Sequence, residues 1–268
     1  MTGPVIAATA RPRTMGSEVA AKLSRYLELT PGERGALAPL EAQEKRLRGG
    51  DVLSRENEPS DLLWVVRSGW LHSSARLPSG ERQILRFHYR GDLIGLSSIA
   101  WAETAETLTA VSDCVVAPFR RRLLGQVFVA EPRLASMLYA VAAAEAVVMS
   151  DRLQSIGRSD ARARLSAILL GILSRLRHSD PRVTDSFHLP LTQIELGDAA
   201  GLTKVHVNRT LRDMEEEGLI ERTGRTVRVL DEAAMVALSG FKDRLEHIAT
   251  DWLPGAGAGA AGPRVAAE

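Results

Sequence analysis

The helices predicted between Thr192 and Glu217 constrain the fold more than any other part of the chain. Thr192 and Glu195 have the spacing of a capping box, in which each side chain accepts a hydrogen bond from the other residue's backbone N–H at a helix start. Gly201 stands where this helix must end in a left-handed residue, and Thr203 is placed to cap a second helix that runs to Glu217. Two short helices joined by a turn that contains glycine predict a helix-turn-helix.

A β-hairpin is predicted directly after the second helix. Residues 219–222 and 226–230 are strand-like and flank the turn Thr223-Gly224-Arg225. A hairpin in this position is the wing of a winged helix. We expect Arg222, Arg225 and Arg228 to lie near phosphates of a bound nucleic acid.

The second helix is expected to contact DNA bases. In a helix-turn-helix, the N-terminal half of this helix enters the major groove. Arg209 is suited to paired hydrogen bonds with guanine O6 and N7, and Val205 can contact a thymine methyl group. The predicted DNA-binding surface consists of Thr192, Thr203, Lys204, Val205, His206, Asn208, Arg209, Arg212 and Arg225.

The charge balance limits any such surface to a local patch. The 268 residues include 34 Lys and Arg against 33 Asp and Glu, which excludes a uniformly basic binder. Basic character is predicted between residues 152 and 182, where only Asp160 and Asp180 face a set of arginines. This set is Arg152, Arg158, Arg162, Arg164, Arg175, Arg177 and Arg182.

Two further parts precede the helix-turn-helix. Between residues 17 and 132, short apolar segments alternate with glycine turns, which predicts a small β-barrel or β-roll with Pro78-Ser79-Gly80 at a hairpin tip. Residues 133–159 contain no Pro, and Gly157 is their only glycine, so one long helix is predicted. Its apolar stripe is wide enough for two interpretations, a core helix of one chain or a coiled coil between two chains.

The order of these parts resembles the Crp/Fnr family of bacterial transcription regulators. The residues that carry the resemblance are Gly50-Asp51, Gly69, Gly80, Gly91-Asp92-Leu93-Ile94-Gly95, Asp160 and the run from Leu191 to Arg209. The resemblance implies an α+β fold with an N-terminal double-stranded β-helix or jelly roll, similar to cyclic-nucleotide-binding domains. The expected parts are a tail over 1–16, the sensor roll over 17–132, a dimerisation helix over 133–159, a winged helix-turn-helix over 160–244, and a mostly disordered tail over 245–268.

The resemblance also locates an effector pocket, at which this chain departs from the cyclic-AMP binders. Those relatives carry a Gly-Glu pair and an Arg-Ser or Arg-Thr pair, whereas here Leu96 follows Gly95, and Thr104 stands where the arginine is expected. Without that arginine a cyclic nucleotide loses a charge-assisted partner, so we do not expect cyclic AMP to be the effector. The pocket residues implied are Gly95, Leu96, Ser97, Ser98, Thr104, Ala105 and Met149.

Other cofactors are not expected either. Iron–sulfur relatives use several N-terminal cysteines, and the one cysteine here, Cys114, is interpreted as a buried, unreactive thiol. Haem-binding relatives use a histidine of the roll, whereas His72 and His88 are interpreted as structural residues. No metal-ligand spacing, nucleophile elbow or phosphate loop indicates an enzyme.

The sequence therefore predicts a cytoplasmic homodimer that binds a palindromic operator in double-stranded DNA, with no membrane-spanning or signal segment. Contact with RNA polymerase is implied by the resemblance alone. Two alternatives stay open. One is a small-molecule sensor whose winged helix binds another protein, and the other is a regulator that needs no ligand.

Overall fold

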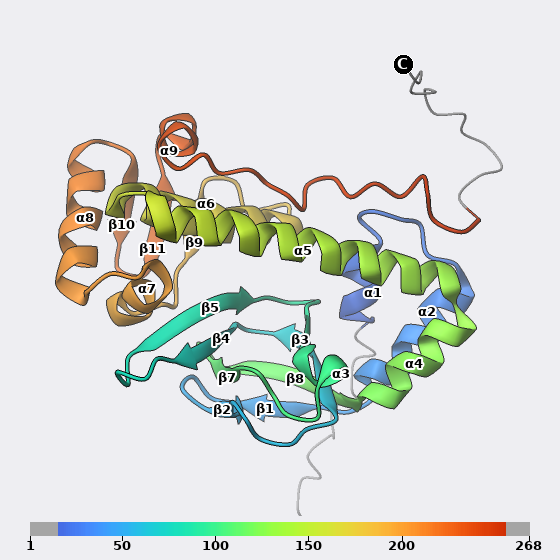
Figure 1. Cartoon of the computed structure of the whole chain (residues 1–268). Helices are drawn as coiled ribbons and strands as arrows, with labels where there is room; N and C mark the ends of the chain where they lie inside the picture. Colours follow the sequence, from blue (N-terminus) through green and yellow to red (C-terminus); the bar gives the residue numbers. More distant parts are fainter. Residues whose placement is uncertain (1–15, 256–268) are drawn as a thin grey trace, which may run out of the picture.

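The computed structural model describes residues 16–255, and the predicted tails at 1–15 and 256–268 lie outside the described part. A helical cap opens the described chain and lies beside a β-roll (Figure 1). The cap consists of α1 (Glu18–Leu23), α2 (Pro31–Leu37) and the 3₁₀ helix η1 (Ala38–Glu41).

The roll is built from two four-stranded antiparallel sheets, as the alternation of short strands and glycine turns predicted. The first sheet has the order β1 (Lys45–Leu47), β8 (Cys114–Arg120), β3 (Leu62–Ser68) and β6 (Leu93–Ile94). The second has the order β2 (Val52–Ser54), β7 (Thr107–Ala110), β4 (Leu71–Arg76) and β5 (Arg82–His88). The short helix α3 (Ser97–Ala100) follows β6. Leucine, valine and isoleucine side chains from both sheets, together with Trp64, fill the space between them.

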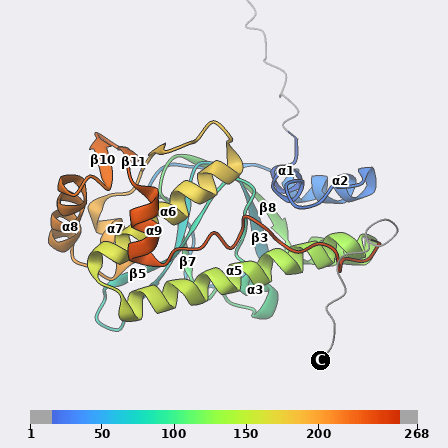
Figure 2. The same cartoon turned by 90° about the horizontal axis from the view of Figure 1, so that it is seen from above.

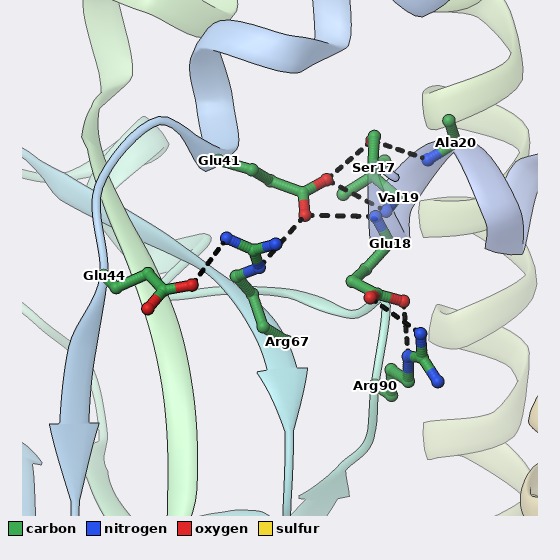
Figure 3. A network of polar contacts seen from close by, with 8 residues as sticks. All are labelled: Ser17, Glu18, Val19, Ala20, Glu41, Glu44, Arg67 and Arg90. Atoms are coloured by element: carbon green, nitrogen blue, oxygen red, sulfur yellow. Dashed lines mark hydrogen bonds and ion pairs between the residues drawn. The ribbon is translucent and has the colours of Figure 1, made fainter. Parts of the chain in front are cut away.

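A network of polar contacts fixes the helical cap on the roll (Figure 3). The buried carboxylate of Glu41 accepts hydrogen bonds from the Ser17 hydroxyl at 2.6 Å and from the backbone N–H groups of Glu18 and Val19 at 3.0 and 3.2 Å. It thereby satisfies N–H groups at the start of α1 that have no partner within the helix. The Glu18 carboxylate pairs with Arg90 after β5, with Nη2 to Oε1 at 2.7 Å.

Two long helices follow the roll. After α4 (Arg121–Ala130), α5 runs over Pro132–Arg158, close to the predicted range, and passes along the roll (Figures 1 and 2). Asp160 caps α6 (Ala161–Ser179) by accepting a hydrogen bond from the Ala163 N–H at 2.8 Å, as predicted. Within residues 16–255, α5 is the one helix long and apolar enough to cross a membrane by length and composition, and much of its surface is not buried in the chain.

The C-terminal domain is a winged helix. It consists of β9 (Ser186–His188), α7 (Gln193–Ala200), α8 (Lys204–Glu216), β10 (Ile220–Thr223), β11 (Thr226–Val229) and α9 (Glu232–Ser239). The strand order is β10-β11-β9, so β9 is an edge strand, as Pro190 beside it predicted. Apolar residues of β5 and of this domain belong to one core cluster, so the winged helix packs directly on the roll.

The C-terminal tail was predicted to begin at residue 245, which is too early. Residues 245–255 are placed in the structure, and Leu245 and Leu253 are both buried at 3% exposure. Leu253 packs in a core cluster with Leu23 and Leu134, far away in sequence, which the glycine- and alanine-rich composition that follows does not reveal.

Two histidines of the roll are buried without charge partners. His72 on β4 and His88 on β5 are 0% and 3% exposed, and neither ring nitrogen of His72 has a hydrogen-bond partner within the described residues. Burial lowers the pKa of His72 from 6.5 to about 4 and that of His88 to about 3. Both are therefore neutral in the folded protein at pH 7, as expected of structural histidines.

These two histidines predict a loss of stability in mild acid. Between pH 6.5 and about 4 the unfolded chain protonates them and the folded chain does not, so the free energy of unfolding falls as the pH falls through that window. The expected loss between pH 7 and 5 is about 2 kcal/mol for each histidine, from about 1.4 kcal/mol per pKa unit. Urea unfolding at the two pH values measures it.

The double variant His72→Gln/His88→Gln should show a flatter pH dependence, and the exposed His247→Gln should not. Should the double variant fail to fold, the histidine proton resonances of the wild-type chain give the same information. Titration of both buried rings between pH 7 and 5 would contradict this account.

Candidate nucleic-acid interface

The turn between α7 and α8 has the geometry that the sequence predicted. The Thr192 hydroxyl accepts from the Glu195 N–H at 3.2 Å, and the Glu195 carboxylate accepts from the Thr192 N–H at 2.8 Å. Gly201 ends α7 with φ of 66°, a left-handed conformation that glycine adopts without strain. The Thr203 hydroxyl then accepts from the His206 N–H at 3.2 Å and caps α8. The two helices are therefore held in a fixed relation by their own backbone and caps.

One face of α8 is buried and the other is open to solvent. Val207, Leu211 and Met214 pack in the core of the winged helix, whereas Val205 is 79% exposed. The predicted surface residues that are exposed are Thr192, Thr203, Lys204, Val205, Asn208, Arg209, Arg212 and Arg225, and His206 is half-buried. Both views place α8 at the end of the molecule where α5 ends, away from α1 and α2 (Figures 1 and 2).

Gln193 is a contact residue that the predicted surface omitted. Its amide Nε2 donates to Asn208 Oδ1 at 3.4 Å and so links the first turn of α7 to the exposed face of α8. This contact orients the Asn208 side chain. In the sequence, the only signal for Gln193 is its position immediately after the capping Thr192. The Gln193–Asn208 contact depends on how α7 and α8 cross.

Two of the three wing arginines form ion pairs within the chain. Arg222 pairs with Glu215 of α8 at 2.6 Å, and Arg228 pairs with Asp185 at 2.9 Å. Of these three arginines, Arg225 in the turn of the hairpin is the one that forms no ion pair within residues 16–255. The carboxylates come from outside the hairpin, so its own sequence could not show that they occupy the two arginines.

The basic patch predicted between residues 152 and 182 is also not formed. Carboxylates or backbone carbonyls engage these side chains, and all of these carboxylates except Asp180 are distant in sequence. The pairs are Arg162–Glu217 at 2.6 Å, Arg177–Glu232 and Arg182–Asp180 each at 2.7 Å, and Arg175–Glu145. Arg164 donates to the Ser159 and Ala200 carbonyls, Arg152 also donates to carbonyls, and the side chain of Arg158 lies outside the described part.

Four cations without carboxylate partners lie together at the interface. Within residues 16–255, Lys204, Arg209, Arg212 and Arg225 belong to no ion pair of 4.0 Å or less. All four are exposed, on α8 and at the hairpin turn. A chain whose net charge is only +1 therefore presents a locally positive surface, as phosphate binding requires.

The loop that was predicted to line an effector pocket is closed by its own contacts. Gly95 has φ of 79°, and a Cβ atom at this position would lie 2.5 Å from Cζ3 of Trp64, so the indole ring already occupies the space next to the glycine. The Ser98 hydroxyl donates to the Gly95 carbonyl at 2.8 Å. Thr104 is 3% exposed, and its hydroxyl donates to the Arg55 carbonyl.

Of the remaining members of the predicted pocket, only Met149 lies away from this loop. Ser97 accepts from the Ala105 N–H at 3.3 Å, which holds the same loop, and Leu96 packs beside the core under the helical cap. Met149 instead lines a separate cavity of about 520 Å³ between β5, α5, α6 and residues 239–245. None of the six predicted residues between 95 and 105 lines that cavity.

Arg152 is the most unusual group in that cavity wall. Its Nη2 donates to the Ile84 carbonyl of β5 at 2.6 Å and to the Ala199 carbonyl of α7 at 2.8 Å. Burial lowers its pKa to about 10, because no carboxylate offsets the loss of hydration. One side chain of α5 thus bonds both the roll and the winged helix.

Cys114 is buried, as predicted, and burial raises the pKa of its thiol to about 11. It is therefore protonated and unreactive at neutral pH. Among the described residues, no group of three or more His, Cys, Asp or Glu side chains is arranged to hold a metal ion.

Comparison with known proteins agrees with this geometry. Residues 163–238 match the family model of the Crp-like helix-turn-helix domain, and residues 44–131 match that of the cyclic nucleotide-binding domain. The transcriptional activator protein FnrA of Stutzerimonas stutzeri is 28% identical over 217 residues, which cover 80% of this chain and 87% of FnrA. The transcriptional activator protein Anr of Pseudomonas aeruginosa is 27% identical over 223 residues, covering 82% of this chain and 90% of Anr.

The structure of FixK2 from Bradyrhizobium japonicum is also similar, with a TM-score of 0.67 and 26% identity over 75% of this chain and 98% of FixK2. The winged helix with its open cationic face, the roll and the long helix between them define a DNA-binding transcription regulator. The chain belongs to the Crp/Fnr family, as the sequence resemblance indicated.

Proposed function

We propose that this regulator acts as a homodimer that reads a palindromic operator through α8 of each subunit. The observation that carries the proposal is the set of four unpaired cations around α8, whereas many other arginines of the chain are bound by carboxylates or carbonyls. Two recognition helices related by a two-fold axis contact half-sites about one helical turn apart, roughly 34–36 Å. The names of FnrA and Anr support activation of transcription as the outcome.

A stripe of small and apolar residues on α5, mostly exposed, supports the dimer. Its members recur at alternating spacings of four and three, the pattern of a coiled-coil seam, and they are Ser136, Tyr139, Ala143, Ala146, Ser150, Leu153 and Gly157. Tyr139 and Leu153 are 72% and 74% exposed in the single chain. The charged residues of the helix lie on other faces, where Arg133 pairs with Glu33, for example. This arrangement favours the coiled coil over a helix buried within one chain.

The contacts of the 95–105 loop support a regulator that does not respond to cyclic AMP. Trp64 fills the space beside Gly95, and neither Leu96 nor Thr104 supplies the charge that a cyclic phosphate needs. One cysteine in the whole sequence cannot hold a four-cysteine iron–sulfur cluster within one chain. We propose that the protein either needs no effector or uses a different one.

The family relationship supports three further properties of the proposal: a cytoplasmic location, contact with RNA polymerase, and regulation without catalysis.

A second candidate function is a sensor whose winged helix binds a protein. The exposed cations around α8 favour DNA as the partner. Substitution of Arg209 distinguishes the two candidate functions.

Substituting Arg209 by Ala is expected to weaken binding to the operator by about 10- to 100-fold, because a bidentate contact with guanine contributes about 1–3 kcal/mol. Fluorescence anisotropy at fixed salt, on a duplex selected by the wild-type chain, measures the change. Arg122→Ala, an exposed arginine of α4, is the matched control and should bind like wild type. Unchanged operator affinity for Arg209→Ala would favour the protein-binding alternative.

Val205 is expected to set the preference at the base pair next to that guanine. A valine can contact a thymine methyl but cannot accept from cytosine N4, whereas a glutamate can. Gel shifts with randomised half-sites should show that Val205→Glu gains a preference for cytosine at this pair while the guanine contact is kept. A wild-type chain that already prefers cytosine there would refute this assignment.

Substituting Tyr139 by Glu is expected to break the dimer, because it places an unpaired charge in the apolar seam of each subunit. Sedimentation velocity at micromolar concentration should show wild type as a dimer and the variant as a monomer. Gln126→Glu, an exposed change on α4, adds the same charge outside the seam and should remain dimeric. A dimeric Tyr139→Glu protein would place the interface elsewhere.

A further inference from the structure

The segment after α9 forms a strap, defined here as residues 240–255. Gly240 ends α9 with φ of 64°, and the chain then runs along α5 toward α2 and α4 (Figures 1 and 2). The strap lies outside both stretches that match the family models, 44–131 and 163–238. It is thus a feature of this chain in addition to the three expected parts.

The first part of the strap is fixed to the winged-helix domain. The Asp243 carboxylate accepts from the Ser174 hydroxyl at 2.6 Å and pairs with His178 Nε2 at 3.1 Å, both on α6. Burial acts to raise the pKa of Asp243, but the hydrogen bonds from His178 and Ser174 outweigh it and lower the pKa to about 2. Phe241 packs against the same domain, with Cε2 3.8 Å from the position of a Cβ atom on Gly171.

The middle of the strap is fixed to the long helix. Arg244 donates to both carboxylate oxygens of Asp151 on α5, from Nε at 2.7 Å and from Nη2 at 3.0 Å. This two-point geometry defines the orientation of both side chains.

The last part of the strap is fixed to the sensor domain. The Tyr26 hydroxyl, which follows α1, donates to the Leu245 carbonyl at 2.7 Å. Leu253 is 3% exposed, and with Ile248 it packs in the core cluster that includes Leu23 of α1 and Leu134 of α5. The strap therefore contacts the winged helix, the long helix and the sensor domain in turn.

We propose that the strap is an intramolecular clasp that holds the winged helix in its DNA-binding orientation and so does the work of an effector. A ligand activates a two-state regulator by binding one arrangement of its domains more tightly than the other. A segment of the same chain that contacts both domains biases the equilibrium in the same way, at the high effective concentration of a tethered group. The clasped arrangement leaves the open face of α8 at the end of α5.

This inference rests on the proposed DNA-binding role of α8, so the test has one readout with DNA and one without. In Arg244→Asp, two aspartates face each other and the clasp should open. The exchanged pair Asp151→Arg/Arg244→Asp restores opposite charges and should close it again. Glu246→Lys, an exposed change within the strap, is the control. A chain that ends at Gly240 removes the clasp altogether.

The readout without DNA is the distance distribution between spin labels on Arg122→Cys and Arg225→Cys, measured by pulsed electron spin resonance in the full chain. It should be narrow in wild type, broad in Arg244→Asp and in the chain ending at Gly240, and narrow again in the exchanged pair. The operator affinity should fall about tenfold in the variants with an open clasp, within the usual range for coupling between sites, and recover in the exchanged pair.

Unchanged distances and affinity in the chain ending at Gly240 would overturn the clasp. Broader distances with tighter operator binding would overturn its direction, since the strap would then be inhibitory. A wild-type chain that binds no palindromic DNA, but shows the expected distances, would refute the proposed function and leave the clasp as a structural element.

Discussion

The fold depends on one buried guanidinium that joins three parts of the chain. Arg152 extends from α5 and donates to a carbonyl of the roll and to a carbonyl of α7. Next to it, Arg82 pairs with Asp198 at 2.7 Å, and the Gln83 amide donates to the Asp198 carbonyl at 2.6 Å. Apolar residues of β5 extend this junction into the core of the winged helix. The junction connects the winged helix to the roll, and α8 lies at the outer end of that domain.

Two kinds of arginine stand out in the distribution of charge. Those that hold the frame are paired with carboxylates or carbonyls, as Arg162 is with Glu217 and Arg177 is with Glu232. Arg209, Arg212 and Arg225 are of the second kind, exposed on α8 and at the hairpin turn with no ion pair among the described residues. Because internal acids pair with many arginines of the first kind, a nearly neutral protein still presents cations together around α8. The same separation accounts for an interface that overall composition does not indicate.

Local signals predicted the local structure well, and contacts between distant residues decided the rest. The capping box at Thr192, the left-handed Gly201 and the edge strand beside Pro190 depend on neighbours within a few residues, so the sequence contains them. The pairs that occupy Arg162 and Arg228 join residues 55 and 43 positions apart, and only the folded chain brings them together. The sequence also could not show what lies beside Gly95, because the ring there belongs to Trp64 on a neighbouring strand.

The most direct test of the account is selection from a randomised duplex library by the purified full-length chain, with and without cyclic AMP. The account predicts that the same palindrome is enriched under both conditions, with a guanine in each half-site. Enrichment of a palindrome only when cyclic AMP is present would show that the contacts at Gly95 and Thr104 do not exclude the nucleotide. Absence of any palindrome under both conditions would contradict a clasped, DNA-binding protein that works without an added ligand.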